Sequence, residues 1–71
     1  MAEELQHEIL DLLETYGQLD SSSIARLTNA HPLTINRNCL DLVRAGQVKL
    51  VSGGSYELTE RGERQLGSNG A

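Results

Sequence analysis

Pro32 and Gly46 bracket the segment that most constrains how this chain can fold. Proline suits the first position of a helix, because the N–H that it lacks would have no intrahelical partner there. Glycine readily adopts the left-handed backbone that ends a helix. Between them, apolar side chains from Ile35 to Leu42 recur at spacings of four and three residues. This pattern predicts a helix over residues 32–45 with one buried face and one face turned to solvent.

Two helices are predicted before this segment. The first, over residues 2–16, follows from a wide apolar stripe: Leu5, Ile9, Leu12, Leu13 and Tyr16. A short connector over residues 17–20 leads to a second helix over residues 22–28, which Asp20 or Ser21 is placed to cap. The first three helices therefore follow one another with short connections.

A β-hairpin and one more helix are predicted after Gly46. The apolar-rich run 47–51 and the run 56–58 read as two strands, separated by the small, flexible turn "SGGS". Thr59 is placed to cap a short last helix over residues 60–66. We therefore expect one domain, residues 1–66, followed by a disordered tail over residues 67–71.

The composition narrows the class of protein. With 71 residues, two tyrosines and no Phe or Trp, the chain lacks the aromatic platforms on which single-stranded nucleic acids stack. Cys39 is the sole cysteine, so it has no internal disulfide partner, and its apolar neighbours predict a buried, unreactive thiol. The sequence contains no apolar run of membrane-spanning length and begins without a basic signal-peptide region. We expect a cytoplasmic protein with no membrane partner.

Charge is distributed unevenly along the chain. Residues 1–20 contain six acidic and no basic side chains, whereas residues 21–71 contain six basic and four acidic ones. The net charge of −4 therefore conceals an acidic first segment and a mildly basic remainder. A solvated, acidic face on the first helix accounts for the acidic first segment.

Two stretches, "SSIARLTNAHPLTINRNCLDLVRAGQV" and "YELTERGERQL", resemble the winged helix-turn-helix family, in particular small archaeal and phage-repressor-like transcriptional regulators. The resemblance implies an α+β, mainly α fold with a three-helix core, a β-hairpin wing and a short C-terminal helix. It also implies a sequence-specific repressor that places its third helix in the major groove of duplex DNA and its wing on the DNA backbone.

The predicted base-reading residues lie early on the third helix: Leu33, Thr34, Asn36 and Arg37. Arg37 points almost directly away from the buried face, with Leu33 and Thr34 beside it and Asn36 on the flank. Arginine pairs well with guanine and asparagine with adenine, while a leucine can contact a thymine methyl group. An ordinary ion pair between Arg37 and Asp41, one turn further on, is the alternative for that arginine.

The predicted contacts to the DNA backbone come from the helices and the wing: Arg26, Arg44, Lys49, Ser52, Gly53, Gly54 and Ser55. For Arg44, stabilisation of the helix C-terminus is an equal alternative. For Arg26 and Lys49, the alternative to a phosphate contact is an ordinary solvated surface position.

The acidity of the chain leaves a second function open. DNA-binding domains usually carry a basic stripe, whereas this chain has a net charge of −4. In addition, Leu33 and Leu40 lie together on the outward face of the third helix, as in a protein interface. The alternative is a winged-helix protein-interaction module that grips a partner with these leucines. A salt-rich cytoplasm, as in halophilic archaea, would instead reconcile an acidic surface with DNA binding.

No catalytic or cofactor motif is recognised. His7 and His31 lie in different segments and form no zinc-ligand spacing with the lone cysteine. The serines of "DSSS" have no paired histidine, and "SGGS" lacks the context of a phosphate-binding loop. We expect no enzyme activity, metal, cofactor or small ligand; a homodimer formed through the first helix stays open.

Overall fold

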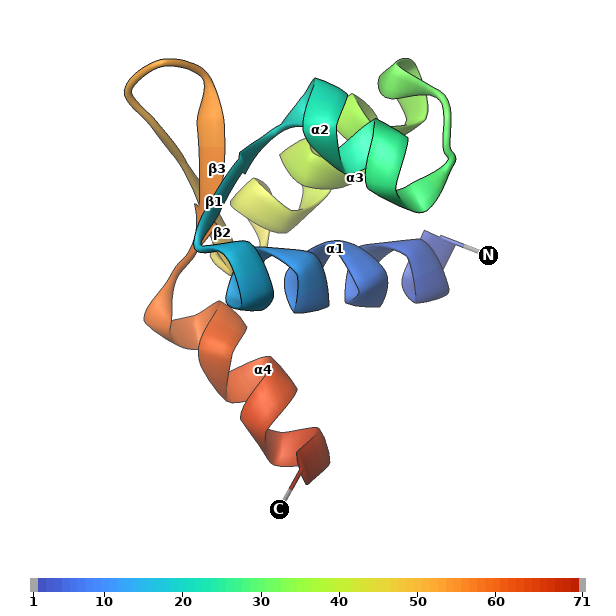
Figure 1. Cartoon of the computed structure of the whole chain (residues 1–71). Helices are drawn as coiled ribbons and strands as arrows, with labels where there is room; N and C mark the ends of the chain where they lie inside the picture. The colour runs from blue at the N-terminus through green and yellow to red at the C-terminus, as the bar shows by residue number, and fades with distance from the viewer. Residues whose placement is uncertain (1, 71) are drawn as a thin grey trace.

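The structure, a computed structural model, describes residues 2–70, with side-chain surroundings described for residues 4–67. In chain order, its elements are α1 (Ala2–Tyr16), β1 (Gln18–Asp20), α2 (Ser21–Thr28), α3 (Pro32–Arg44), β2 (Val48–Val51), β3 (Ser55–Leu58) and α4 (Glu60–Gly70). The predicted α+β, mainly helical class is confirmed for these residues. In Figure 1, α1 runs beneath α2 and α3, the β2–β3 hairpin stands beside them, and α4 projects below α1.

Helix α1 has the predicted bounds and forms the centre of the core. Ile9 and Leu13 are fully buried because α2, α3, the sheet and α4 all pack against this helix. Two details of the predicted stripe are wrong. Tyr16 is 57% exposed because the chain turns away directly after it, and Leu10, outside the predicted stripe, is buried on the side where Leu66 of α4 is also buried.

The connector after α1 is part of the sheet. Strand β1 pairs antiparallel with β3, with Leu19 opposite Tyr56, and β2 pairs with the other edge of β3. Within the hairpin, Lys49 lies opposite Glu57. The central strand β3 is therefore flanked on both sides, and its register fixes which side chains of the hairpin face the helices.

Helices α2 and α3 are joined by a short turn. Asp20 occupies the N-cap position of α2 with extended backbone but makes no capping hydrogen bond with its side chain. Asn29 ends α2 in the left-handed conformation, with φ of 59°. Ile24 and Ala25 form the buried side of α2, whereas Leu27 is 48% exposed.

The C-terminus of α3 is tied to the start of α4. Gly46 has a φ of 77°, as predicted, and its N–H and that of Gln47 bond to the last carbonyls of α3, so the helix ends one residue earlier than expected. The Thr59 hydroxyl donates to Gly46 O and also accepts from the Gly62 N–H. The predicted cap of α4 by Thr59 is therefore confirmed.

Helix α4 is longer than predicted. Its backbone continues to Gly70, four residues beyond Leu66, so that boundary was wrong. Ala71 lies outside the described residues, and the disorder of residues 67–71 stays a prediction. Over the part of the chain described, we find no helix with the length and apolar character needed to cross a membrane.

The described core combines side chains from every helix and from the hairpin. Its buried apolar members are Ile9, Leu10, Leu13, Ile24, Ala25, Ile35, Cys39, Leu42, Val48, Tyr56 and Leu66. The apolar residues expected on the inward face of α3 are all among them, which leaves the opposite face of that helix for other contacts.

Candidate nucleic-acid interface

The N-terminus of α3 is fixed by a local capping arrangement. Pro32 occupies the first helical position, as predicted. The Nδ1 atom of His31 accepts a hydrogen bond of 3.1 Å from the Leu33 N–H, so the imidazole caps the helix. This capping role of His31 was not predicted from the sequence. Its place directly before a helix-starting proline was the signal that could have identified this role.

A buried polar contact joins α3 to α1. Asn38 is only 8% exposed; its Nδ2 donates to Thr34 O at 2.8 Å, and its Oδ1 accepts from Gln6 Nε2 at 3.2 Å. The burial of Asn38 was not predicted, because one polar residue on the flank of an apolar stripe carries no distinctive pattern. This contact, together with the buried Ile35 and Cys39, fixes how α3 is rotated about its own axis.

The four predicted base-reading residues are all exposed: Leu33, Thr34, Asn36 and Arg37. They lie in the first two turns of α3, where Leu33 and Arg37 point most directly away from the buried face and Thr34 and Asn36 lie on its two flanks. The predicted alternative for Arg37, an ion pair with Asp41, does not form. Asp41 pairs instead with Arg44, at 3.8 Å between Oδ1 and Nη1. Arg37 has no ion pair or hydrogen bond to any other described side chain.

The C-terminal end of α3 already has a cationic partner. The Nη1 atom of Arg61, from α4, donates to Ala45 O at 3.3 Å. Arg44 lies in the last turn and is largely exposed, with its one close acidic neighbour on the same helix face. Both roles considered for Arg44, helix stabilisation and contact with DNA, are open to a side chain in this position.

The hairpin places its charged groups in one cross-strand row. Lys49 Nζ lies 3.1 Å from Glu57 Oε1, and Gln18 Nε2 donates to Glu57 Oε2 at 2.9 Å. The hydrogen bond from Gln18, together with the hydrogen bond and charge of Lys49, lowers the pKa of Glu57. Lys49 is therefore partly neutralised, although its side chain is still more than half exposed.

The tip of the hairpin is an exposed turn formed by residues 52–54. Gly53 and Gly54 both have positive φ, and the Gly54 N–H donates to Val51 O at 3.2 Å. Ser55, the fourth of the predicted contact residues of this turn, is half-buried and belongs to β3. The turn therefore offers backbone amides and small side chains, but no charge of its own.

Arg26 projects from α2 close to the start of α3. It shares a shallow surface groove with Asn29 and Pro32 and makes no ion pair within 4 Å among the described side chains. The pKa of Asp20 is lowered mainly by the polar groups of Ser23 near its carboxylate, with a smaller contribution from the charge of Arg26. Arg26 thus lies close to Pro32, the first residue of the helix that carries the predicted base-reading residues.

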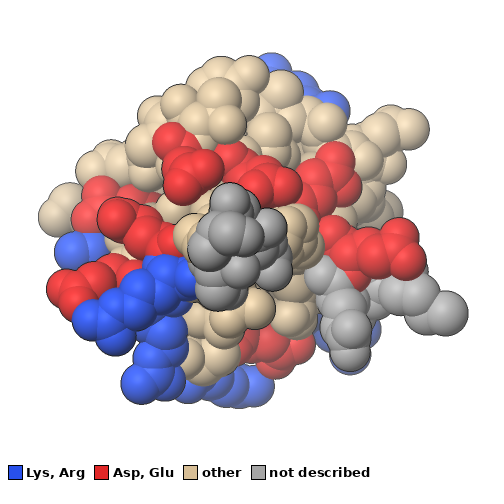
Figure 2. All heavy atoms as spheres, turned by 90° about the horizontal axis from the view of Figure 1, so that it is seen from below, with Lys and Arg blue, Asp and Glu red and all other residues tan. Residues whose placement is uncertain are grey.

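Acidic side chains gather on another face of the molecule. Figure 2 shows the molecule from below, where α4 and α1 lie in Figure 1, with Asp and Glu across the middle and Lys and Arg toward the margins. Exposed acids on α1 include Glu4, Glu8, Asp11 and Glu14. The uneven charge seen in the sequence therefore corresponds to an acidic face that is distinct from the exposed side of α3.

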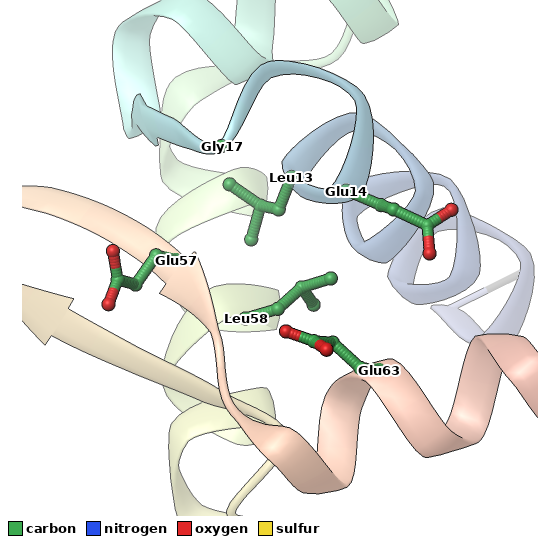
Figure 3. A pocket seen from close by; sticks show the side chains of 6 residues that line it. All are labelled: Leu13, Glu14, Gly17, Glu57, Leu58 and Glu63. Carbon is green, nitrogen blue, oxygen red and sulfur yellow. The ribbon is translucent and has the colours of Figure 1, made fainter.

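A second hollow, between α1, β3 and α4, is lined by three glutamates that come from different elements (Figure 3). The side chains of Glu14 and Glu57 point away from each other, while Glu63 lies beside Leu58. Within the described part of the chain, no three His, Cys, Asp or Glu side chains are grouped so that they could hold a metal ion.

Comparison with models of known protein families gave no match, and a search of curated proteins found none with significant similarity to this chain.

Proposed function

We propose that this chain is a winged helix-turn-helix domain that binds duplex DNA sequence-specifically and acts as a repressor-type transcriptional regulator. Helix α3 enters the major groove, and the β2–β3 hairpin, the wing of this fold, contacts the backbone. The order of helices and strands is compatible with this fold. The resemblance of residues 22–66 to small archaeal and phage regulators supports it further.

Arg37 is the observation that carries the proposal. A guanidinium left without an ion pair on an exposed helix face is available for a ligand, whereas Arg44, Lys49 and Arg64 each lie within 4 Å of a carboxylate. Bidentate hydrogen bonding to the O6 and N7 atoms of guanine suits a free guanidinium. Asn36 lies next to Arg37 in the sequence and offers the corresponding pattern for adenine.

The backbone contacts come from the elements that flank α3. Arg26, on α2, lies close to the start of α3, Arg44 lies in the last turn of α3, and Lys49 lies on the hairpin. About four phosphate contacts per chain give a salt dependence no steeper than a slope of roughly minus four. In the salt-rich cytoplasm considered above, such a domain would depend more on base contacts than on phosphate contacts.

The test compares two arginines of equal charge. Arg37→Ala should weaken binding to a preferred duplex by about 1 to 3 kcal/mol and relax the preference at one base pair. Arg64→Ala, on α4, removes the same charge from a side chain that pairs with Glu60 and should leave the preference intact. Fluorescence anisotropy with duplexes selected from a random pool, and with scrambled versions of them, measures both effects. Equal losses for the two variants would contradict base reading by Arg37.

A second candidate function rests on the exposed leucines. Leu33, Leu40 and Leu50 are between 49% and 65% exposed, and the net charge is −4. A protein-interaction module would use these side chains as its apolar contacts. In that case Leu33→Ala and Leu40→Ala would abolish a protein contact, while Arg37→Ala would have no effect on DNA binding.

A further inference from the structure

The exposed face of α3 carries a narrow stripe in which apolar and cationic side chains alternate. Leu33, Arg37, Leu40 and Arg44 follow one another at spacings of four, three and four residues. At 100° per residue, they fall within a sector of about 60° on the helix surface. Leu33 is 65% exposed and Leu40 is 49% exposed, so the rest of the described chain leaves both largely uncovered.

Each part of this stripe matches one chemical feature of the major groove. The thymine C5-methyl group is an apolar group at the base edge, and guanine offers the paired acceptors that suit arginine. Leu33 and Leu40 are separated by seven residues, which is a rise of about 10.5 Å along the helix. With a rise of about 3.4 Å per base pair, that distance corresponds to about three base-pair steps.

We infer that α3 reads thymine methyl groups with Leu33 and Leu40 on either side of a guanine read by Arg37. The inference rests on the proposed DNA-binding function and specifies the target: a half-site in which thymines flank a guanine within a few base pairs. DNA is favoured over a protein partner as the occupant because of charge complementarity. The leucines lie beside the unpaired guanidinium of Arg37 and beside Arg44, which pairs with Asp41, whereas the acidic residues of α1 lie on another face.

The experiment removes the methyl groups without changing base pairing. Duplexes selected by the protein from a random pool are resynthesised with uracil in place of thymine, and the affinity for both forms is measured by anisotropy. Burial of one methyl group corresponds to about a fourfold change in affinity. The wild-type chain should bind the thymine duplex about fourfold more tightly for each methyl group that it contacts. Scrambled duplexes should show no such difference.

Variants separate contact with the leucines from changes in DNA shape. Leu33→Ala and Leu40→Ala should each reduce the thymine-to-uracil affinity ratio. Leu27→Ala, which removes from α2 a leucine about as exposed as Leu40, should leave the ratio unchanged. Thermal unfolding followed by circular dichroism checks that all three variants are folded, as expected for substitutions at exposed positions.

The outcomes distinguish this inference from the proposed function. Sequence-selective binding with equal affinity for thymine and uracil duplexes would overturn the inference alone, as would a ratio that both leucine variants retain. Equal affinity for the thymine and uracil duplexes is also the result expected if Leu33 and Leu40 contact a protein partner instead of DNA. Selection that enriches no sequence would overturn the proposed function together with the inference.

Discussion

Gly62, in the first turn of α4, lies against the backbone carbonyl of Gln47, at the start of the hairpin. A Cβ atom placed on Gly62 would lie 2.1 Å from Gln47 O and 3.0 Å from Leu58 Cδ2. Because the nearest atom belongs to the backbone, it cannot move aside by a change of rotamer. The Thr59 N–H donates to the same carbonyl at 3.1 Å, so the junction between hairpin and α4 depends on this close approach.

Gly62→Ala should therefore destabilise the fold. We expect a loss of about 1 to 3 kcal/mol or more in the free energy of unfolding, as for other overpacked sites. Gly67→Ala is the matched control, because a Cβ there meets nothing within 4 Å, and alanine favours a helix over glycine by up to about 1 kcal/mol. Urea unfolding of both variants measures the difference. A Gly62→Ala variant as stable as the wild type would show that the junction can open without cost.

Asn38 should contribute to stability through its hydrogen bond to Gln6. Asn38→Ala removes the contact between α1 and α3 and leaves Thr34 O without this donor, which should cost about 1 to 2 kcal/mol. Asn36→Ala, two residues away on the exposed side, should change stability by less than about 0.5 kcal/mol. Chemical unfolding at neutral pH compares the two; equal effects would argue against a role for Asn38 in fixing α3.

Glu57→Gln should strengthen non-specific DNA binding. The substitution removes the carboxylate 3.1 Å from Lys49 Nζ and so frees the amine for a phosphate, which should steepen the salt slope by about one. Glu60→Gln makes the same charge change beside Arg64 on α4 but leaves Lys49 paired with Glu57, so it should leave the slope unchanged. Affinities for a scrambled duplex over a salt series give both slopes. If the two variants behave alike, only net charge matters and the hairpin makes no phosphate contact.

Cys39 should react slowly with thiol reagents in the folded protein. The side chain is fully buried, and burial raises the pKa of the thiol from 9.0 to about 11. Since the thiolate is the reactive form, labelling at pH 8 must await opening of the fold and should become faster as the pH is raised. Labelling with a chromogenic disulfide in buffer and in denaturant compares the two states. Equal rates would place Cys39 outside the core.

Much of the helical framework was predictable from the sequence because its signals are local. Pro32 and Gly46 bracket α3, and the buried positions of that helix follow from apolar spacing alone. Thr59 was placed as a cap by its position before a polar, helix-forming run. Each of these depends on interactions within a few residues, so a single sequence carries the information.

What the sequence did not reveal depends on contacts between distant segments. The burial of Leu10 requires α4 to pack on that side of α1, and the Gln6–Asn38 hydrogen bond requires the relative rotation of two helices. The pairing of Lys49 with Glu57 depends on the register of the hairpin. In the candidate interface, the exposure of the predicted residues followed from helix geometry. Which of their charged groups form ion pairs could not be predicted from that geometry.

The central claim, that α3 and the hairpin bind duplex DNA, is tested most directly by amide chemical-shift perturbation. A ¹⁵N-labelled chain is titrated with a short random-sequence duplex at low salt, where phosphate contacts are strongest. We expect shift changes concentrated in residues 32–44 and 52–55, with the exposed acidic residues of α1 unaffected. The absence of any change, or changes confined to α1 and α4, would contradict it.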